Sequence, residues 1–216
     1  MFPLHTVLLP GMPLTLRIFE ERYRVMLGRL LDQEHPDFGV VLIERGADAG
    51  GGDVRRTLGT VARVVQLDAG EGDIGVLAVG SERIRVTRWL PDDPHPIAEV
   101  EAVPALAYKD ELAPLLGEVE GVVRRVLARA AEYGDAAWSG TIGLSDDPVT
   151  AAWQLAGIAP FAQLDRQSLL GAASLAELLQ RTLDLTIAAE PLLTAPAPPD
   201  DLDAAIEELL GDADEE

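Results

Sequence analysis

The chain has 216 residues, of which 48% are hydrophobic and 25% charged, a composition typical of a soluble globular protein. It contains no cysteine, which excludes a disulfide framework and cysteine-ligated zinc, and no apolar run approaches the ~20 residues of a membrane span. The formal net charge of −20 disfavours binding to nucleic-acid phosphates. We expect a cytoplasmic protein, because the N-terminus lacks the basic region and cleavage site of a secretory signal.

The first thirty residues predict a strand, a tight turn, a second strand and a helix in quick succession. Residues 4–9 are largely apolar, and residues 10–13 have turn chemistry, because proline presets φ and glycine tolerates positive φ. Alternation over residues 14–18 predicts a half-buried strand. Apolar side chains then recur at steps of three and four over residues 19–31, which indicates an amphipathic helix.

Five further strands are predicted before residue 104, one of them closed by Gly80. Six or seven short strands with one early helix favour an antiparallel or mixed β-barrel or sandwich. Glycine and aspartate dominate residues 45–56, which predicts a mobile surface loop. The five strand segments are residues 38–43, 58–67, 74–79, 83–89 and 97–103.

The composition changes near residue 108, beyond which helices are predicted. Residues 111–133 carry apolar side chains at helical spacing, and Gly134 is a plausible C-cap. Asp147 before Pro148 indicates a capped helix start. Ser174-Leu-Ala-Glu177 matches a capping box that opens a further helix, which we expect Pro191 to stop.

The chain is therefore divided into three parts. We expect a β-rich subdomain at residues 1–107, a helical bundle at residues 108–192, and a Pro-rich linker with an acidic tail at residues 193–216. An apolar stripe in the tail predicts a helix that docks on the body or on a partner, and a disordered solubilising tail is the equal alternative. The stripe comprises Leu202, Ile206, Leu209 and Leu210.

No motif for catalysis, cofactor binding or metal binding is visible. The sequence has no Walker-type phosphate loop and no G-x-S-x-G elbow. Its one lysine, Lys109, lies beside Asp110 and Glu111 at the subdomain junction and is interpreted as a solvated linker residue. The three histidines do not have the spacing of a metal site, and His5 is interpreted as a hydrogen-bonded structural residue in a strand. We therefore predict no catalytic residue, no cofactor and no metal.

Three arginines alternate with apolar residues in the strand at 83–89, beside an aromatic residue. Arginine interleaved with an aromatic side chain on a β-surface can bind nucleic acid. The favoured interpretation is a solvated strand face that pairs with Glu99 and Glu101, because the chain as a whole is strongly acidic. The three residues are Arg83, Arg85 and Arg88.

The opening run FPLHTVLLPGMPLTLRIFEERYRVML closely resembles the start of the Lon protease N-terminal domain, the substrate-recognition domain of that family. The segments FGVVLI, LGTVARVV, GDIGVLAVGSERIRV, IAEVEAV and DPVTAAWQLA follow in the family's order. The similarity spans residues 1 to about 192. It implies an α+β fold, with a PUA-like β-barrel followed by a small α-helical bundle.

Lon proteases continue into an ATPase module and a Ser-Lys protease, whereas this sequence continues into the linker and acidic tail. We therefore expect a stand-alone form without ATPase or peptidase activity. The resemblance implies recognition of unfolded or tagged protein segments. The first hypothesis is a non-enzymatic protein-binding module that engages unfolded or hydrophobic segments or a partner protein, as an adaptor or regulator in protein quality control.

The turn and the following helix provide the candidate contact surface. Methionine adapts to permissive surfaces and aromatic side chains anchor interfaces. The alternative is that the two aromatic residues belong to the core, which is favoured for Phe19. A second hypothesis, a PUA-like module that binds nucleic acid or nucleotides, rests on fold analogy alone; a hydrolase is the third. The candidate residues are Pro10, Met12, Pro13, Phe19 and Tyr23.

Overall fold

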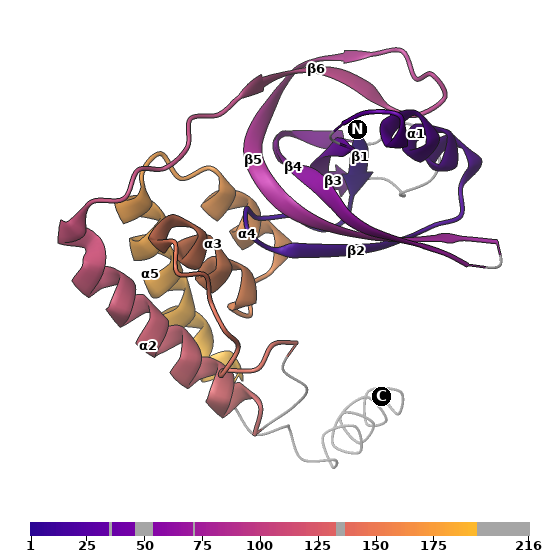
Figure 1. Ribbon diagram of the computed structural model, residues 1–216. Coiled ribbons are helices and arrows are strands. Elements are labelled where there is room, and N and C mark those ends of the chain that lie inside the picture. The colour runs from indigo at the N-terminus through magenta and orange to yellow at the C-terminus, as the bar shows by residue number, and fades with distance from the viewer. Residues whose placement is uncertain (35, 46–53, 71, 133–136, 194–216) are drawn as a thin grey trace, which may run out of the picture.

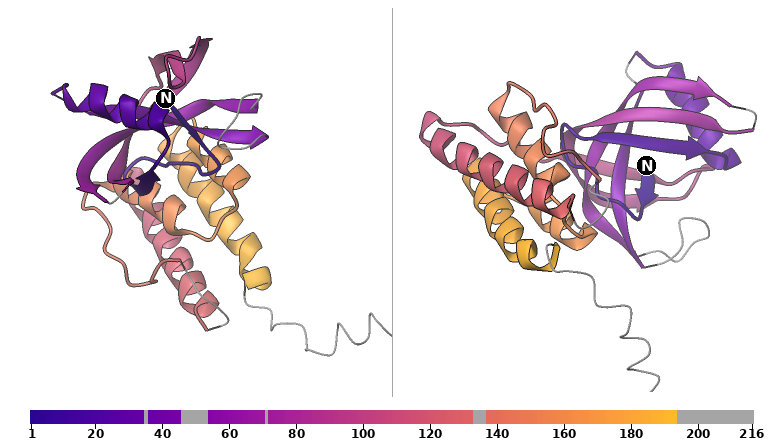
Figure 2. Two further views of the ribbon diagram at one scale, coloured as in Figure 1. Left: turned by 90° about the vertical axis from the view of Figure 1, so that its right-hand side faces the viewer. Right: turned by 90° about the horizontal axis from the view of Figure 1, so that it is seen from below.

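The computed structural model describes residues 1–34, 36–45, 54–70, 72–132 and 137–193, which form two halves (Figure 1). A curled six-stranded sheet with a single helix makes up the first half, and a group of helices makes up the second. Figure 2 shows the helical half packed against one side of the curled sheet. The predicted α+β class is confirmed.

The strands form one mixed sheet in the order β1-β3-β4-β5-β2, with β6 also paired to β5. Strand β1 runs parallel to β3, and the other pairs are antiparallel. Because β5 is long, its first part pairs with β2 and its last part pairs with β6. The strands are β1 at Phe2–Leu4, β2 at Pro13–Ile18, β3 at Asp37–Arg45, β4 at Val54–Ala69, β5 at Ile74–Leu90 and β6 at Ile97–Ala102.

The prediction that Gly80 closes a strand is wrong, because β5 continues through it. Glycine is required there for a close approach, since an added Cβ would clash with the carbonyl oxygen of Leu9. The Gly80 N–H donates to the carbonyl of Met12 at 2.9 Å, and its own carbonyl accepts from the N–H of Gly11 at 2.8 Å. Gly80 therefore holds the loop before β2 against the middle of β5.

Helix α1, at Glu21–Leu31, follows the predicted apolar stripe. Its residues Tyr23, Met26 and Leu27 are buried, and the Tyr23 ring stacks on Phe2 with centroids 3.9 Å apart. The helix covers one end of the curled sheet (Figure 1).

The helical half is built around α5, which packs against α2, α3 and α4. Helix α4 has no counterpart in the sequence prediction. The expectation that Pro191 stops the last helix is also wrong, because α5 continues two residues beyond it, where the missing N–H affects only the final turn. The elements are a 3-10 turn at Asp110–Leu112, α2 at Ala113–Ala130, α3 at Pro148–Ile158, α4 at Gln163–Leu170 and α5 at Leu175–Leu193.

Both predicted helix starts carry capping hydrogen bonds. A carboxylate oxygen of Asp147 accepts from the N–H of Thr150 at 2.8 Å and from its hydroxyl at 2.7 Å. At α5, the Ser174 hydroxyl accepts from the Glu177 N–H at 3.2 Å. The Glu177 carboxylate accepts from the N–H of Ala173, one residue earlier than an ideal capping box would place it.

We expect Asp147→Ala to lower the free energy of unfolding by about 1 kcal/mol, because the substitution removes the N-cap of α3. The hydrogen bonds from Thr150 lower the pKa of Asp147 below its ordinary value. A lowered folded-state pKa means that the cap stabilises the fold above the unfolded-state pKa, and that this stabilisation is lost as the pH falls through the folded-state pKa.

Urea unfolding of the parent chain and the variant, at about pH 7 and about pH 3, measures this difference. The difference in unfolding free energy between the parent chain and Asp147→Ala should be smaller at the lower pH. Asp147→Asn is the control, because it keeps a capping oxygen without a titrating carboxylate. A gap between parent and alanine variant that is equal at both pH values would contradict the assigned role of the carboxylate.

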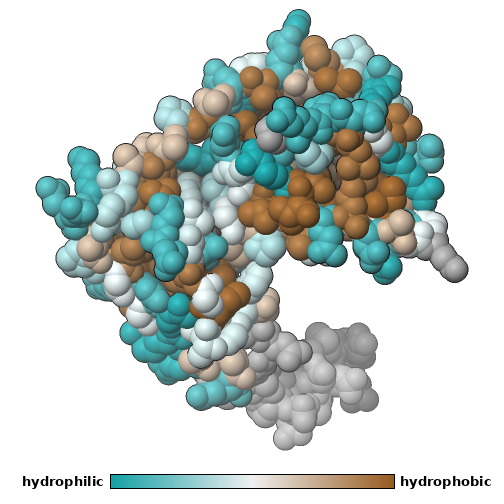
Figure 3. Space-filling view, in the orientation of Figure 1, coloured by the Kyte–Doolittle hydropathy of each residue, from teal (hydrophilic) through white to brown (hydrophobic). Residues whose placement is uncertain are grey.

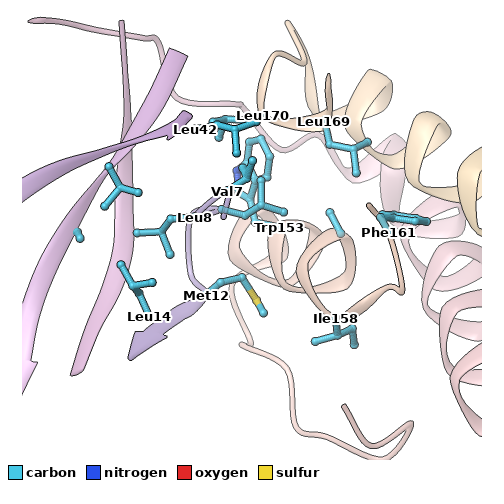
Figure 4. Close-up of a cluster of buried hydrophobic side chains, with 14 of the residues drawn as sticks. Val7, Leu8, Met12, Leu14, Leu42, Trp153, Ile158, Phe161, Leu169 and Leu170 are labelled. Carbon is cyan, nitrogen blue, oxygen red and sulfur yellow. The ribbon is translucent and has the colours of Figure 1, made fainter. Parts of the chain in front are cut away.

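One hydrophobic core passes through both halves. Figure 4 shows Leu8 and Leu14 on the sheet side and Phe161 on the helical side, with Met12 and Trp153 between them. Residues 103–109 connect the halves, and Leu106 in this connection is buried. None of the helices described is long and apolar enough to cross a membrane.

Candidate functional site

The turn predicted at residues 10–13 is present, with Gly11 at φ +73°, but it does not present Met12 to solvent. Met12 is 8% exposed and lies against α3, where a Cβ added at Gly157 would clash with its side chain. Gln154 of the same helix donates from Nε2 to the Gly11 carbonyl at 3.3 Å. The turn is therefore a contact between the two halves, in which Pro13 is exposed and Pro10 and Gly11 are half-buried.

The two aromatic candidates have opposite environments. Phe19 is 70% exposed, so the favoured expectation that it belongs to the core is wrong; α1 begins only at Glu21 and leaves Phe19 on the link from β2. Tyr23 is buried in the core, and burial raises its pKa. Strand β2 separates Met12 from Phe19 by about 20 Å. The five candidate residues thus do not form one surface.

The three arginines of the basic strand are also separated. Arg85 and Arg88 are exposed and pair with carboxylates of β6, as the favoured interpretation expects. The Arg85 Nε lies 3.5 Å from Oε1 of Glu101. Arg88 forms a bidentate ion pair with the carboxylate of Glu99. Arg83 is only 5% exposed and makes no ion pair within the described ranges. They do not form a basic groove.

Arg83 connects three parts of the chain. Its Nη1 donates to the carbonyl of Leu170, the last residue of α4, at 3.0 Å and to that of Ala172, in the link to α5, at 2.7 Å. Its Nη2 donates to the carbonyl of Pro104 at 2.6 Å, in the connection after β6. The guanidinium carbon lies 5.4 Å from the ring centroid of Trp153 on α3. Arg83 therefore ties the sheet to the helical half.

A cavity of about 630 Å³ lies beside Arg83, at the junction of the two halves. It opens along the edge of β5 where pairing with β2 has ended at Val79 and pairing with β6 begins at Ile84. We call this space the junction cavity. Its apolar lining includes Pro10, Val79, Val103, Leu106, Val149 and Trp153.

Burial lowers the pKa of Arg83, because the low-polarity surroundings disfavour its charged form. The guanidinium nevertheless stays charged at neutral pH, since its ordinary pKa is far above 7. The junction cavity thus combines apolar walls with one buried positive charge, an arrangement typical of ligand sites with few polar contacts.

The sequence prediction missed the helical wall of this site. Helix α3 contributes Val149, Thr150 and Trp153. Seven of its eleven residues are buried, on every side of the helix. A helix that is apolar all round is enclosed rather than half-exposed, and this property of α3 is the signal that could have placed it at the junction.

Groups suited to catalysis do not gather elsewhere in the described residues. His5 is exposed beyond the end of β1, so the expectation of a histidine inside a strand is wrong. Lys109 is exposed in the connection between the halves. Burial lowers the pKa of His95, whose Nδ1 lies 3.2 Å from the Pro96 carbonyl. No cluster of three or more acidic or histidine side chains suited to a metal occurs in the ranges described.

Several predictions fall outside the described residues. They concern residues 46–53 of the loop predicted at 45–56, the C-cap at Gly134, and the tail with its apolar stripe. At its two ends the loop prediction is wrong, because Arg45 belongs to β3 and residues 54–56 belong to β4. The stripe residues in question are Leu202, Ile206, Leu209 and Leu210.

Comparisons with known proteins agree with the architecture. Residues 1–187 match the family model described as the ATP-dependent protease La (LON) substrate-binding domain. None of the curated proteins compared with the chain matches it.

Two solved structures illustrate the likeness. The crystal structure of a Lon N-terminal domain protein from Xanthomonas campestris is 29% identical, with a TM-score of 0.55 over 87% of this chain and 95% of that one. The N-terminal domain of a Mycobacterium avium complex Lon protease is 19% identical, with a TM-score of 0.60 over 86% of this chain and 96% of that one. The second likeness bears on the fold alone.

Proposed function

Because the chain belongs to the substrate-binding domain family of the ATP-dependent protease La (LON), we propose that it is a non-enzymatic module that binds unfolded or hydrophobic segments of other proteins. The family match over residues 1–187 is the observation that carries this proposal. The junction cavity supports it, because apolar walls favour apolar side chains.

The surface around the junction is also suited to an extended ligand. Figure 3 shows the molecule hollowed between its two halves, with apolar side chains gathered on the sheet beside the hollow. Contiguous apolar surface of this kind marks interaction sites in soluble proteins. A polypeptide segment could therefore contact the hollow while one of its side chains enters the junction cavity.

The finer part of the proposal concerns the cellular role. The family description names substrate binding, and an adaptor or regulator that presents substrates to a separate protease would use that activity alone. We place this role in protein quality control in the cytoplasm. The nucleic-acid alternative has no support from the basic strand, because Arg85 and Arg88 pair with carboxylates and Arg83 is buried.

Binding to a permanently unfolded polypeptide tests the proposal. We expect the chain to bind reduced, carboxymethylated α-lactalbumin and to discriminate against the native form by about tenfold or more, since only the unfolded form exposes apolar segments. Fluorescence anisotropy of the labelled polypeptide measures both affinities. Equal affinity for the two forms, or no binding to either, would contradict the function.

A further inference from the structure

The junction cavity contains a positive charge that no described carboxylate neutralises. Burying a charged group is costly unless it is paired or hydrogen-bonded, and the hydrogen-bond acceptors of Arg83 among the described residues are all carbonyls. Three carbonyl dipoles stabilise the guanidinium without cancelling its charge. A ligand that enters the cavity therefore meets apolar walls and one uncompensated cation.

The hydrogen bonds of Arg83 leave one side of its guanidinium available. The group has five N–H donors, and the described contacts use both on Nη1 and one on Nη2. The N–H on Nε and the second one on Nη2 remain. The atoms Nε and Nη2 share one edge of the planar group, and an edge of this kind binds a carboxylate through two parallel hydrogen bonds.

One other charged side chain, Glu82, lines the cavity, and it is exposed. Adjacent side chains of a strand point to opposite faces, and along β5 the exposed Glu82 is followed directly by the buried Arg83. The pKa of Arg83 is governed by burial. Glu82 therefore does not occupy the place of a counter-ion to Arg83.

We propose that the junction cavity binds the C-terminal residue of a polypeptide. Its α-carboxylate meets the Nε and Nη2 edge of Arg83, and its apolar side chain packs against Trp153 and Leu106. An internal segment of an unfolded chain offers apolar side chains without an anion, whereas a chain end with an apolar last residue supplies both. This inference rests on the proposed function and narrows the substrate class to proteins with exposed apolar C-termini.

The test uses one short, N-terminally labelled peptide that ends in alanine and leucine, prepared with a free C-terminal carboxylate and as the C-terminal amide. We expect the amide to bind about tenfold more weakly, because it lacks the charge that Arg83 recognises. Fluorescence anisotropy with the full chain measures both affinities. Octanoate, which has the same chemistry without a peptide, is added as a competitor and should displace the peptide poorly.

Variants of the chain localise the effect. Val79→Glu places a carboxylate in the cavity wall, where it repels the α-carboxylate of the ligand, and should abolish the preference for the acid peptide. Val65→Glu is the matched control, because Val65 is 55% exposed on β4 and does not line the cavity; it should retain the preference. Thermal unfolding of both variants confirms that they remain folded.

Equal binding of acid and amide, an unchanged preference in Val79→Glu, or octanoate displacement as effective as that by unlabelled acid peptide would each overturn the proposal. Binding of unfolded α-lactalbumin would then still stand, since it does not depend on a chain end. Loss of that binding, together with a preserved acid preference, would refute the broader function and support the narrower site.

Discussion

Replacing Arg83 by alanine is expected to lower the free energy of unfolding by about 3–5 kcal/mol. The substitution leaves the carbonyls of the buried residues Leu170 and Ala172, and that of the exposed Pro104, without their donor. Each unsatisfied buried carbonyl costs about 1–3 kcal/mol, and relief of the buried charge offsets part of the total.

Arg85→Ala is the matched control on the same strand. Arg85 is exposed and its one ion-pair partner among the described residues is Glu101 at 3.5 Å, so its loss should cost less than about 1 kcal/mol. Urea denaturation with fitted m-values measures both variants. Similar losses for the two arginines would show that Arg83 does not tie the halves together. For Arg83→Lys we expect a loss of unfolding free energy between those of Arg83→Ala and Arg85→Ala, because one ammonium group cannot donate in all the directions of a planar guanidinium.

Gly80→Ala is expected to destabilise the fold by about 3 kcal/mol or more, although it adds a single methyl group. The added Cβ would clash with the backbone oxygen of Leu9, which cannot rotate away as a side chain can. Relief of the clash requires the loop to leave β5, which breaks the hydrogen bonds with Gly11 and Met12. Movement of Met12 would in turn disturb its packing against α3.

Gly28→Ala provides a control with the opposite sign. Gly28 lies inside α1 with open space around it, so alanine should stabilise the fold by about 0.5–1 kcal/mol through higher helix propensity. Thermal unfolding gives both values, and hydrogen exchange at the Gly11 amide reports whether the loop has moved. A loss below about 1 kcal/mol for Gly80→Ala, with unchanged exchange at Gly11, would contradict the close approach.

Local features were predictable wherever the signal lies within a few residues. The turn at Gly11, the cap at Asp147 and the start of α5 at Ser174 each depend on neighbours in the sequence, and the structure contains all three. The fold class was predictable because the hydrophobic period changes near residue 108.

Contacts between distant segments were not predictable from those signals. Alternation along β5 places Arg83 and Arg85 on the same side of the strand, but it does not reveal that the helical half covers only one of them. Gly80 has the appearance of a strand terminator because the residue it accommodates, Leu9, is far away in the chain. From the sequence, Met12 is expected to be a surface residue of a turn, because α3, the helix that covers it, is also far away in the chain.

The core shared by the two halves has a consequence for the order in which the chain is synthesised. Gly11 and its partner Gln154 are 143 residues apart, so the turn is made long before the helix that covers it. At bacterial or eukaryotic translation speeds of about 5–20 residues per second, this interval is roughly 7–30 s. During that time Met12 and its apolar neighbours emerge from the ribosome uncovered. The growing chain thus exposes apolar surface that it later encloses, and its own nascent form resembles the segments it is proposed to bind.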